Sequence, residues 1–126
     1  MSMDITTDYR ASMFDGESDI SWLRQGWRGL RFYGKRAKAA IEAGDIQTKA
    51  EMILRADQLL DIMAGILDTE ANSTLGPALM TVYTALRYTL FRANAENNPA
   101  ALDDFETALA FLDRDMIKSS ESAIAA

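Results

Sequence analysis

"FRANAENNPAALDDF", residues 91–105, joins the end of one predicted helix directly to the start of the next. Asn98 is a favoured helix N-cap, and Pro99 follows it at the first helical position, where a missing N–H costs little. Apolar residues at helical spacing lie on both sides of this pair. The stretch therefore predicts two helices joined by a tight turn, and short connections favour antiparallel neighbours.

The same pattern extends through most of the chain. Apolar residues recur at spacings of three and four, Gly44 fits a helix C-cap, and Asp45 can cap the helix that follows. The predicted helices cover about residues 18–43, 45–69, 73–97 and 98–117. We expect an all-α protein, an antiparallel up-down four-helix bundle. Its expected flanks are an extended or short helical N-terminal cap at 1–17 and a flexible tail at 119–126.

The composition argues against most enzyme classes. The 126 residues include no cysteine and no histidine, which removes thiolate metal sites and the usual general base. The net charge of −6 argues against a nucleic-acid partner. We predict no catalytic residues, no metal and no cofactor. No apolar stretch is long enough to span a bilayer and no signal peptide is evident, so we expect a cytoplasmic protein without membrane insertion.

Opposite charges gather in the first and last predicted helices. Residues 19–41 carry one acid and these basic residues: Arg24, Arg28, Arg31, Lys35, Arg36 and Lys38. From residue 96 onward acids predominate. Because the first and fourth helices of an up-down bundle are neighbours, we expect these charges to flank their seam. The alternative is a basic patch for nucleic acid or lipid.

Three glycines interrupt the first predicted helix, each at a cost of about 1 kcal/mol relative to alanine. Gly34 falls on the core stripe, where a neighbouring helix can approach closely. Gly26 and Gly29 lie on one side together with Trp22 and Tyr33. This side is either a packing face within the bundle or the floor of a shallow groove for a foreign helix.

The second and third predicted helices offer further candidate contacts. Besides its core stripe, the second helix carries Met52, Leu59, Ile62 and Ile66. This second stripe indicates a docking surface, a thicker core or a homodimer face. The third helix carries a polar-edged strip made of Tyr83, Arg87 and Asn94.

Residues 82–105, VYTALRYTLFRANAENNPAALDDF, resemble the third-helix signature of the flagellar secretion chaperone family FliS. Tyr83 matches the first tyrosine of that signature, and Ala93-Asn94 and Asn97-Asn98 match its later pairs. AKAAIEAGDI at 37–46 and ADQLLDIMAGILD at 56–68 are similar to the joint after the family's first helix and to its second helix. The resemblance covers about residues 9–116.

The resemblance implies a cytoplasmic chaperone that binds the C-terminal segment of newly made flagellin. Such a chaperone prevents premature polymerisation and keeps its guest competent for export, and export-gate components are a further candidate partner. The implied flagellin-binding residues are Trp22, Gly26, Gly29, Tyr33, Leu59, Ile62, Ile66, Tyr83, Arg87 and Asn94. The alternatives are a self-associating structural bundle and a chaperone for a different secreted protein.

The N-terminal segment carries apolar residues without a sustained helical period: Ile5, Tyr9, Met13 and Phe14. In FliS-like chaperones an N-terminal tyrosine segment covers part of the guest groove, and Tyr9 is the position that resembles it. The resemblance therefore implies that these four residues form a displaceable lid.

Deleting residues 1–16 tests the lid, because a cover over an apolar groove limits self-association but competes with the guest. We expect the truncated protein to bind the flagellin segment at least as tightly as the full chain, and to self-associate more. Titration calorimetry and sedimentation velocity measure the two properties. Loss of binding with an intact fold would contradict the lid, and a frayed tail would change neither property.

Overall fold

The computed structural model describes residues 20–69 and 76–116. Four α-helices span these ranges: α2 (Ile20–Ala43), α3 (Ile46–Thr69), α4 (Gly76–Glu96) and α5 (Pro99–Phe111). A short π-helix, η1 (Leu112–Met116), continues α5. The predicted all-α four-helix bundle is confirmed. The predicted cap at 1–17, the lid residues within it and the tail at 119–126 lie outside the described residues.

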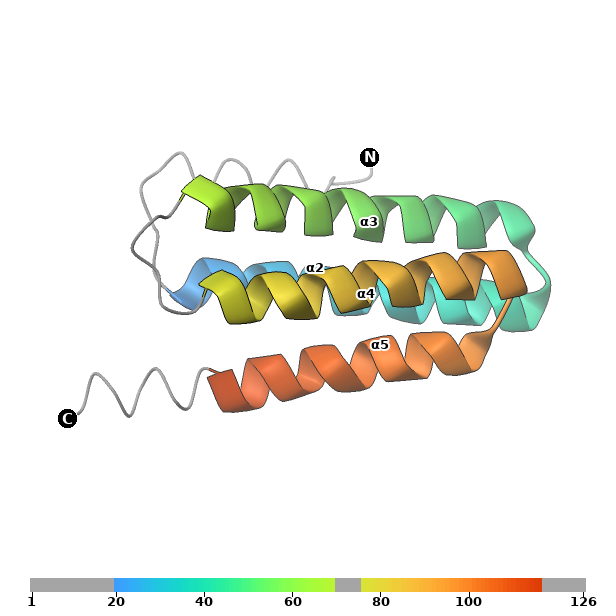
Figure 1. The fold of residues 1–126 in the computed structure, drawn as a ribbon. Helices are drawn as coiled ribbons and strands as arrows, with labels where there is room; N and C mark the ends of the chain where they lie inside the picture. Colours follow the sequence, from blue (N-terminus) through green and yellow to red (C-terminus); the bar gives the residue numbers. More distant parts are fainter. Residues whose placement is uncertain (1–19, 70–75, 117–126) are drawn as a thin grey trace, which may run out of the picture.

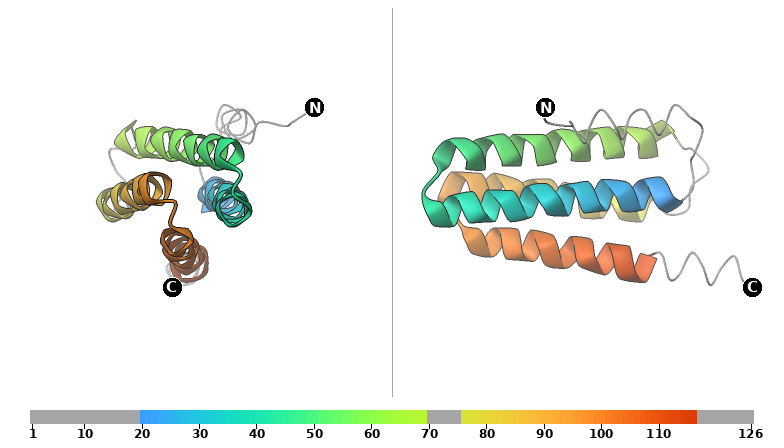
Figure 2. Two further views of the ribbon diagram at one scale, coloured as in Figure 1. Left: turned by 90° about the vertical axis from the view of Figure 1, so that its right-hand side faces the viewer. Right: turned by 180° about the vertical axis from the view of Figure 1, so that it is seen from behind.

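Successive helices run in opposite directions (Figure 1). α2 packs against α3 and α5, and α4 packs against the same two helices, so the four helices close into a ring. Figure 2 shows this ring almost end-on in its left view. The α2–α3 and α4–α5 turns consequently lie at the same end of the bundle (Figure 1).

Both tight turns use the cap residues that the sequence predicted. Gly44 has φ 73°, a left-handed conformation that glycine adopts easily. The Asp45 carboxylate accepts hydrogen bonds from the Thr48 hydroxyl at 2.6 Å and the Thr48 N–H at 3.1 Å. These bonds hold the pKa of the Asp45 carboxyl below its ordinary value. At the other turn, Asn98 Oδ1 accepts from the Ala100 N–H at 3.0 Å.

A buried lysine ties the second turn to α3. The Lys49 Nζ donates to the Asn94 carbonyl at 3.2 Å and to Asn97 Oδ1 at 2.6 Å. Asn97 itself has φ 50°. The ammonium thus satisfies a carbonyl at the C-terminal end of α4, where the helix dipole also favours a positive charge.

The core fills the centre of the ring with large apolar side chains from all four helices. Trp27 of α2, Met63 of α3, Leu90 of α4 and Phe105 of α5 are all fully buried or nearly so. At 25 cal/mol per Å², burial of such side chains stabilises the fold by roughly 1.5–3 kcal/mol each. Because every helix contributes side chains to this core, its burial holds the four helices together.

Gly34 lies at a close approach of α2 to α5. A Cβ atom at this position would lie 3.0 Å from Cδ2 and 3.2 Å from Cε2 of the Phe105 ring. The ring is itself fully buried, so it has little room to move. Close approach of a neighbouring helix thus explains a glycine inside α2.

Replacing glycine by alanine should have opposite effects at Gly34 and Gly65. Gly65 is exposed on α3 and a Cβ there would meet nothing within 4 Å. Gly65→Ala should therefore raise the free energy of unfolding by about 0.5–1 kcal/mol through helix propensity. Gly34→Ala should lower it by about 1 kcal/mol, because overpacking against Phe105 outweighs the same propensity gain. Urea denaturation measures both, and equal stabilisation of the two variants would contradict the tight contact.

Candidate partner-binding surface

The structure buries the four predicted groove residues of α2. Trp22 and Tyr33 are almost inaccessible, and Gly26 and Gly29 are buried with them. A guest could contact these residues only if the surrounding structure moved. Their contact with flagellin therefore stays a prediction that requires a rearrangement.

The second apolar stripe of α3 lies mainly in the core. Leu59 is fully buried and Ile66 is buried, and both belong to the same cluster as the central apolar residues. Ile62 and Met52 are half-buried at the edge of that cluster. The thicker core is thus the interpretation that fits Leu59 and Ile66, because α3 packs against two neighbouring helices rather than one.

The predicted polar-edged strip on α4 is wrong as a single surface. Tyr83 is only 1% exposed, and its hydroxyl accepts a hydrogen bond from Trp27 Nε1 at 3.1 Å in the core. Burial raises the pKa of the Tyr83 hydroxyl well above its ordinary value. Arg87 and Asn94 are exposed. A four-residue step rotates the helix about 40° beyond a full turn, which is enough to separate Tyr83 from Arg87.

Arg87 already has partners within the bundle. Its Nε and Nη2 donate to the two Asp57 carboxylate oxygens at 2.9 and 3.2 Å, and its Nη1 lies 3.4 Å from Asp61 Oδ1. The hydrogen bond to Asp57 raises the pKa of the Arg87 guanidinium. Arg87 thus joins α4 to α3 without any guest.

The charges of α2 and α5 meet at their seam, as the sequence predicted. Arg31 lies 2.7 Å from Glu106, and Arg24 lies 2.9 Å from Asp113. The hydrogen bond to Glu106 raises the pKa of Arg31. A further ion pair joins Lys38 to Asp103 at 2.7 Å. Lys35 also lies 3.9 Å from Glu106, so four of the six basic residues are engaged within the bundle and the basic-patch interpretation loses most of its residues.

An apolar groove that was not predicted from the sequence lies between α4 and α5. Its volume is about 460 Å³. The walls include Ala78, Leu79 and Val82 of α4 and Thr107, Ala108 and Phe111 of α5, with Asp104 also at the groove. Phe111 is 53% exposed. The signal in the sequence was the pairing of small residues on two helices, which periodicity along one helix does not reveal.

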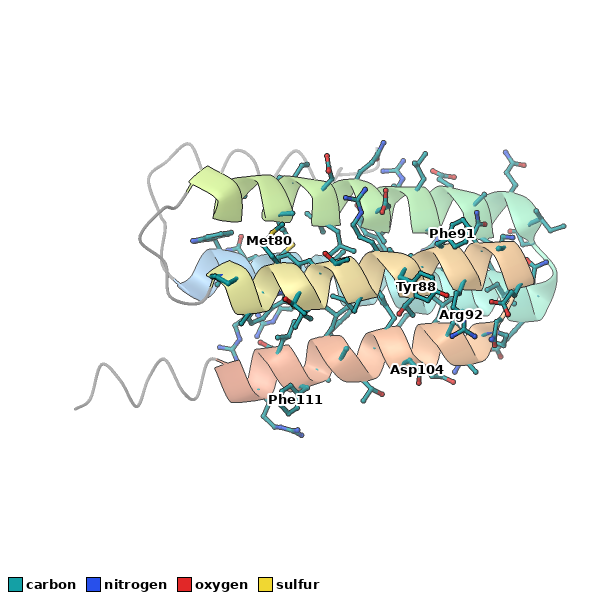
Figure 3. All side chains as sticks on the ribbon, in the orientation of Figure 1. Met80, Tyr88, Phe91, Arg92, Asp104 and Phe111 are labelled. Carbon is teal, nitrogen blue, oxygen red and sulfur yellow. The ribbon has the colours of Figure 1, made fainter. Side chains whose placement is uncertain are left out.

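Two further aromatic side chains are exposed on α4. Tyr88 is 64% exposed and Phe91 is 67% exposed, and both project from the surface of this helix (Figure 3). Leu54 on the neighbouring α3 is also exposed. α4 therefore presents two large aromatic side chains to solvent, with an apolar side chain of α3 also exposed.

No group of three or more potential metal-ligating side chains occurs within 20–69 and 76–116. No helix in those ranges combines the length and apolarity needed to cross a membrane.

The arrangement of the four helices agrees with a comparison with known families. A family model described as "Flagellar protein FliS" matches residues 20–115. The chain belongs to the FliS family. This family is the flagellar export chaperone family. A search of curated proteins gives no match.

The FliS match covers α2 to α5 and nearly all of η1. The predicted lid residues Ile5, Tyr9, Met13 and Phe14 lie outside both the matched range and the described residues. The lid therefore stays a prediction. The signature that suggested FliS, residues 82–105, lies inside the match and includes the buried Tyr83.

The Tyr83 hydroxyl should matter for stability. Tyr83→Phe leaves the indole N–H of Trp27 without its acceptor in the core, which should lower the free energy of unfolding by about 1–3 kcal/mol. Tyr88→Phe is the matched control, because that hydroxyl is on an exposed side chain, and it should change stability little. Urea denaturation followed by tryptophan fluorescence measures both. Equal stability of the two variants would show that the Trp27–Tyr83 hydrogen bond is dispensable.

Proposed function

We propose that this chain is a cytoplasmic chaperone that binds the C-terminal segment of flagellin before export. Support comes from one observation above all. A member of a flagellar export chaperone family presents an open apolar groove and exposed aromatic residues on α4 and α5. Such surfaces suit apolar side chains of a partner helix.

The physical task of such a chaperone is to cover the surfaces through which its guest would polymerise. A flagellin segment that is unfolded when free gains its order on the bundle, so part of the interaction energy is used in folding the segment. The complex is consequently weaker than its buried area alone suggests. A moderate affinity suits a guest that must be released for export.

The predicted contact residues take different parts in this proposal. Arg87, Asn94 and Ile62 are accessible enough to contact a guest on the free protein. Tyr83 and Leu59 act through the packing that shapes the surface, because both are buried. The buried residues of α2 contact the guest only after a rearrangement. Export-gate components are a second proposed partner, which would bind the loaded chaperone.

Binding can be tested with the C-terminal segment of the flagellin from the same organism. We expect a one-to-one complex, a gain of helical circular dichroism and a negative heat-capacity change on binding, because apolar area is buried. Titration calorimetry at several temperatures measures the heat-capacity change. The central segment of the same flagellin is the control.

If mixing with the segment gives no heat and no gain of helical circular dichroism, the proposal is wrong. A tight dimer in sedimentation velocity that excludes the segment would favour a self-associating bundle. Binding of another exported protein, with no binding of flagellin, would identify a chaperone for a different secreted protein.

A further inference from the structure

The groove between α4 and α5 combines an apolar floor with one acidic side chain. We propose that it holds an amphipathic helix of the guest, with a lysine or arginine of that helix facing Asp104. This inference rests on the proposed function and adds to it the place of docking and the chemistry of the docked segment.

The dimensions of the groove suit about two turns of helix. Its wall on α5 and the start of η1 runs from Asp104 to Leu112. At 1.5 Å per residue these eight steps extend about 12 Å. A guest helix that presents apolar residues at i, i+3 or i+4, and i+7 covers that length. Small residues on both walls, Ala78 and Ala108, leave the space that its side chains would fill.

Asp104 is the one acid of α5 that forms no ion pair among the described residues, although the charge of Arg92 on α4 acts on it. The other acids of this helix, Asp103 and Glu106, pair with Lys38 and Arg31 on α2. Among the described residues Asp104 makes no ion pair, and it is exposed. A carboxylate beside an apolar groove attracts a cation and disfavours an acidic partner there.

Arg92 stands near Asp104 but has another partner. Its Nε donates to Glu96 at 3.1 Å, one helical turn further along α4. That hydrogen bond is the largest cause of the raised pKa of Arg92, and the charge of Asp104 adds a smaller contribution. Figure 3 shows Arg92 and Tyr88 on α4 above Asp104 on α5. Arg92 therefore partly offsets the charge of Asp104 without forming an ion pair with it, and the carboxylate can still pair with a guest cation.

The position of Asp104 also fixes the end of the groove at which the guest cation lies. Asp104 lies toward the end of the bundle that holds the two tight turns, whereas Ala78 and Leu112 lie toward the other end. The cation of the guest must therefore follow or precede its apolar stripe at the turn end. An apolar stripe with a basic residue at one end is the sequence pattern that we expect in the guest.

A second copy of this chain fits the groove less well. Two copies meeting at this face would bring two net charges of −6 together, and each would contribute an unpaired Asp104. A basic guest helix would instead be attracted to this acidic protein. Charge therefore favours a partner over self-association.

Charge substitutions on α5 provide the first test, with the flagellin C-terminal segment as the probe. Asp104→Asn should weaken binding by about twofold to fivefold, which is typical of an exposed ion pair. Asp104→Lys should weaken it by about tenfold or more, because attraction becomes repulsion. Asp103→Asn is the matched control, since this neighbour faces Lys38 on α2, and it should leave the affinity unchanged. Added salt should reduce the difference between the wild type and Asp104→Asn.

A reciprocal exchange identifies the guest residue. Each lysine or arginine of the segment is replaced in turn by glutamate. One of these replacements should weaken binding to the wild type and bind better to Asp104→Lys than to the wild type. If no guest charge is coupled to Asp104 in this way, the ion pair does not form and the proposal is wrong.

Thiol protection locates the helix independently, because the natural chain has no cysteine. Thr107→Cys places a single thiol at the exposed edge of the groove, and Gln58→Cys places one on the exposed side of α3 as a control. The segment should slow the reaction of the first thiol with a maleimide and leave the second unchanged. Thr107→Trp should fill the groove and abolish binding while circular dichroism remains that of the wild type.

Other outcomes would overturn the inference. Protection of the Thr107→Cys thiol that rises with protein concentration alone would assign the groove to a second copy. If the Thr107→Cys thiol is protected without the flagellin segment, and deletion of residues 117–126 removes this protection, the groove holds this chain's own C-terminal segment. If Asp104→Lys and Thr107→Trp both bind the flagellin segment with wild-type affinity, the segment binds elsewhere on the bundle. The proposed function would then still stand. No binding by the wild type would refute the proposed function and this inference together.

Discussion

The contact between Gly34 and Phe105 is the constraint on which the bundle depends. Tight turns connect α2 to α3 and α4 to α5, but α2 and α5 are far apart in sequence and only side chains bring them together. The Phe105 ring lies 3.0 Å from where a Cβ of residue 34 would be, so the two helices approach at one register. Ion pairs on both sides, such as Arg31–Glu106, contribute little energy individually but disfavour other registers.

The position of α5 against α2 decides what its other face presents. Its paired acids lie toward α2, which leaves Asp104 and the small residues Thr107 and Ala108 toward α4. Protein interiors are normally packed as densely as organic crystals. Across this second seam Ala78 and Ala108 are too small to reach that density, and the groove results. One helix thus has a polar, well-paired side and an apolar, open side.

The sequence predicted those features that depend on one helix or on neighbouring residues. Cap chemistry at Asp45 and Asn98 located both turns, and charge segregation predicted the α2–α5 seam. Tyr83 was misplaced because a tyrosine fits both a core and a surface, and spacing does not resolve a rotation of about 40°. The groove depends on which small residues of α4 and α5 face each other, so it could not be found without the helix pairing.

The polar contacts of α4 are distributed unevenly, and this bears on how a chaperone could bind and release a guest. Arg87 and Lys49 hold α4 to α3, whereas no ion pair or side-chain hydrogen bond joins α4 to α5 within the described part of the chain. A guest in the α4–α5 groove would therefore break no ion pair or side-chain hydrogen bond between these described helices. A guest at Trp22 or Gly26 would first have to uncover them, and that cost lowers its apparent affinity. The open groove is therefore suited to the first contact with a guest, and the buried face of α2 is suited to a contact that forms later.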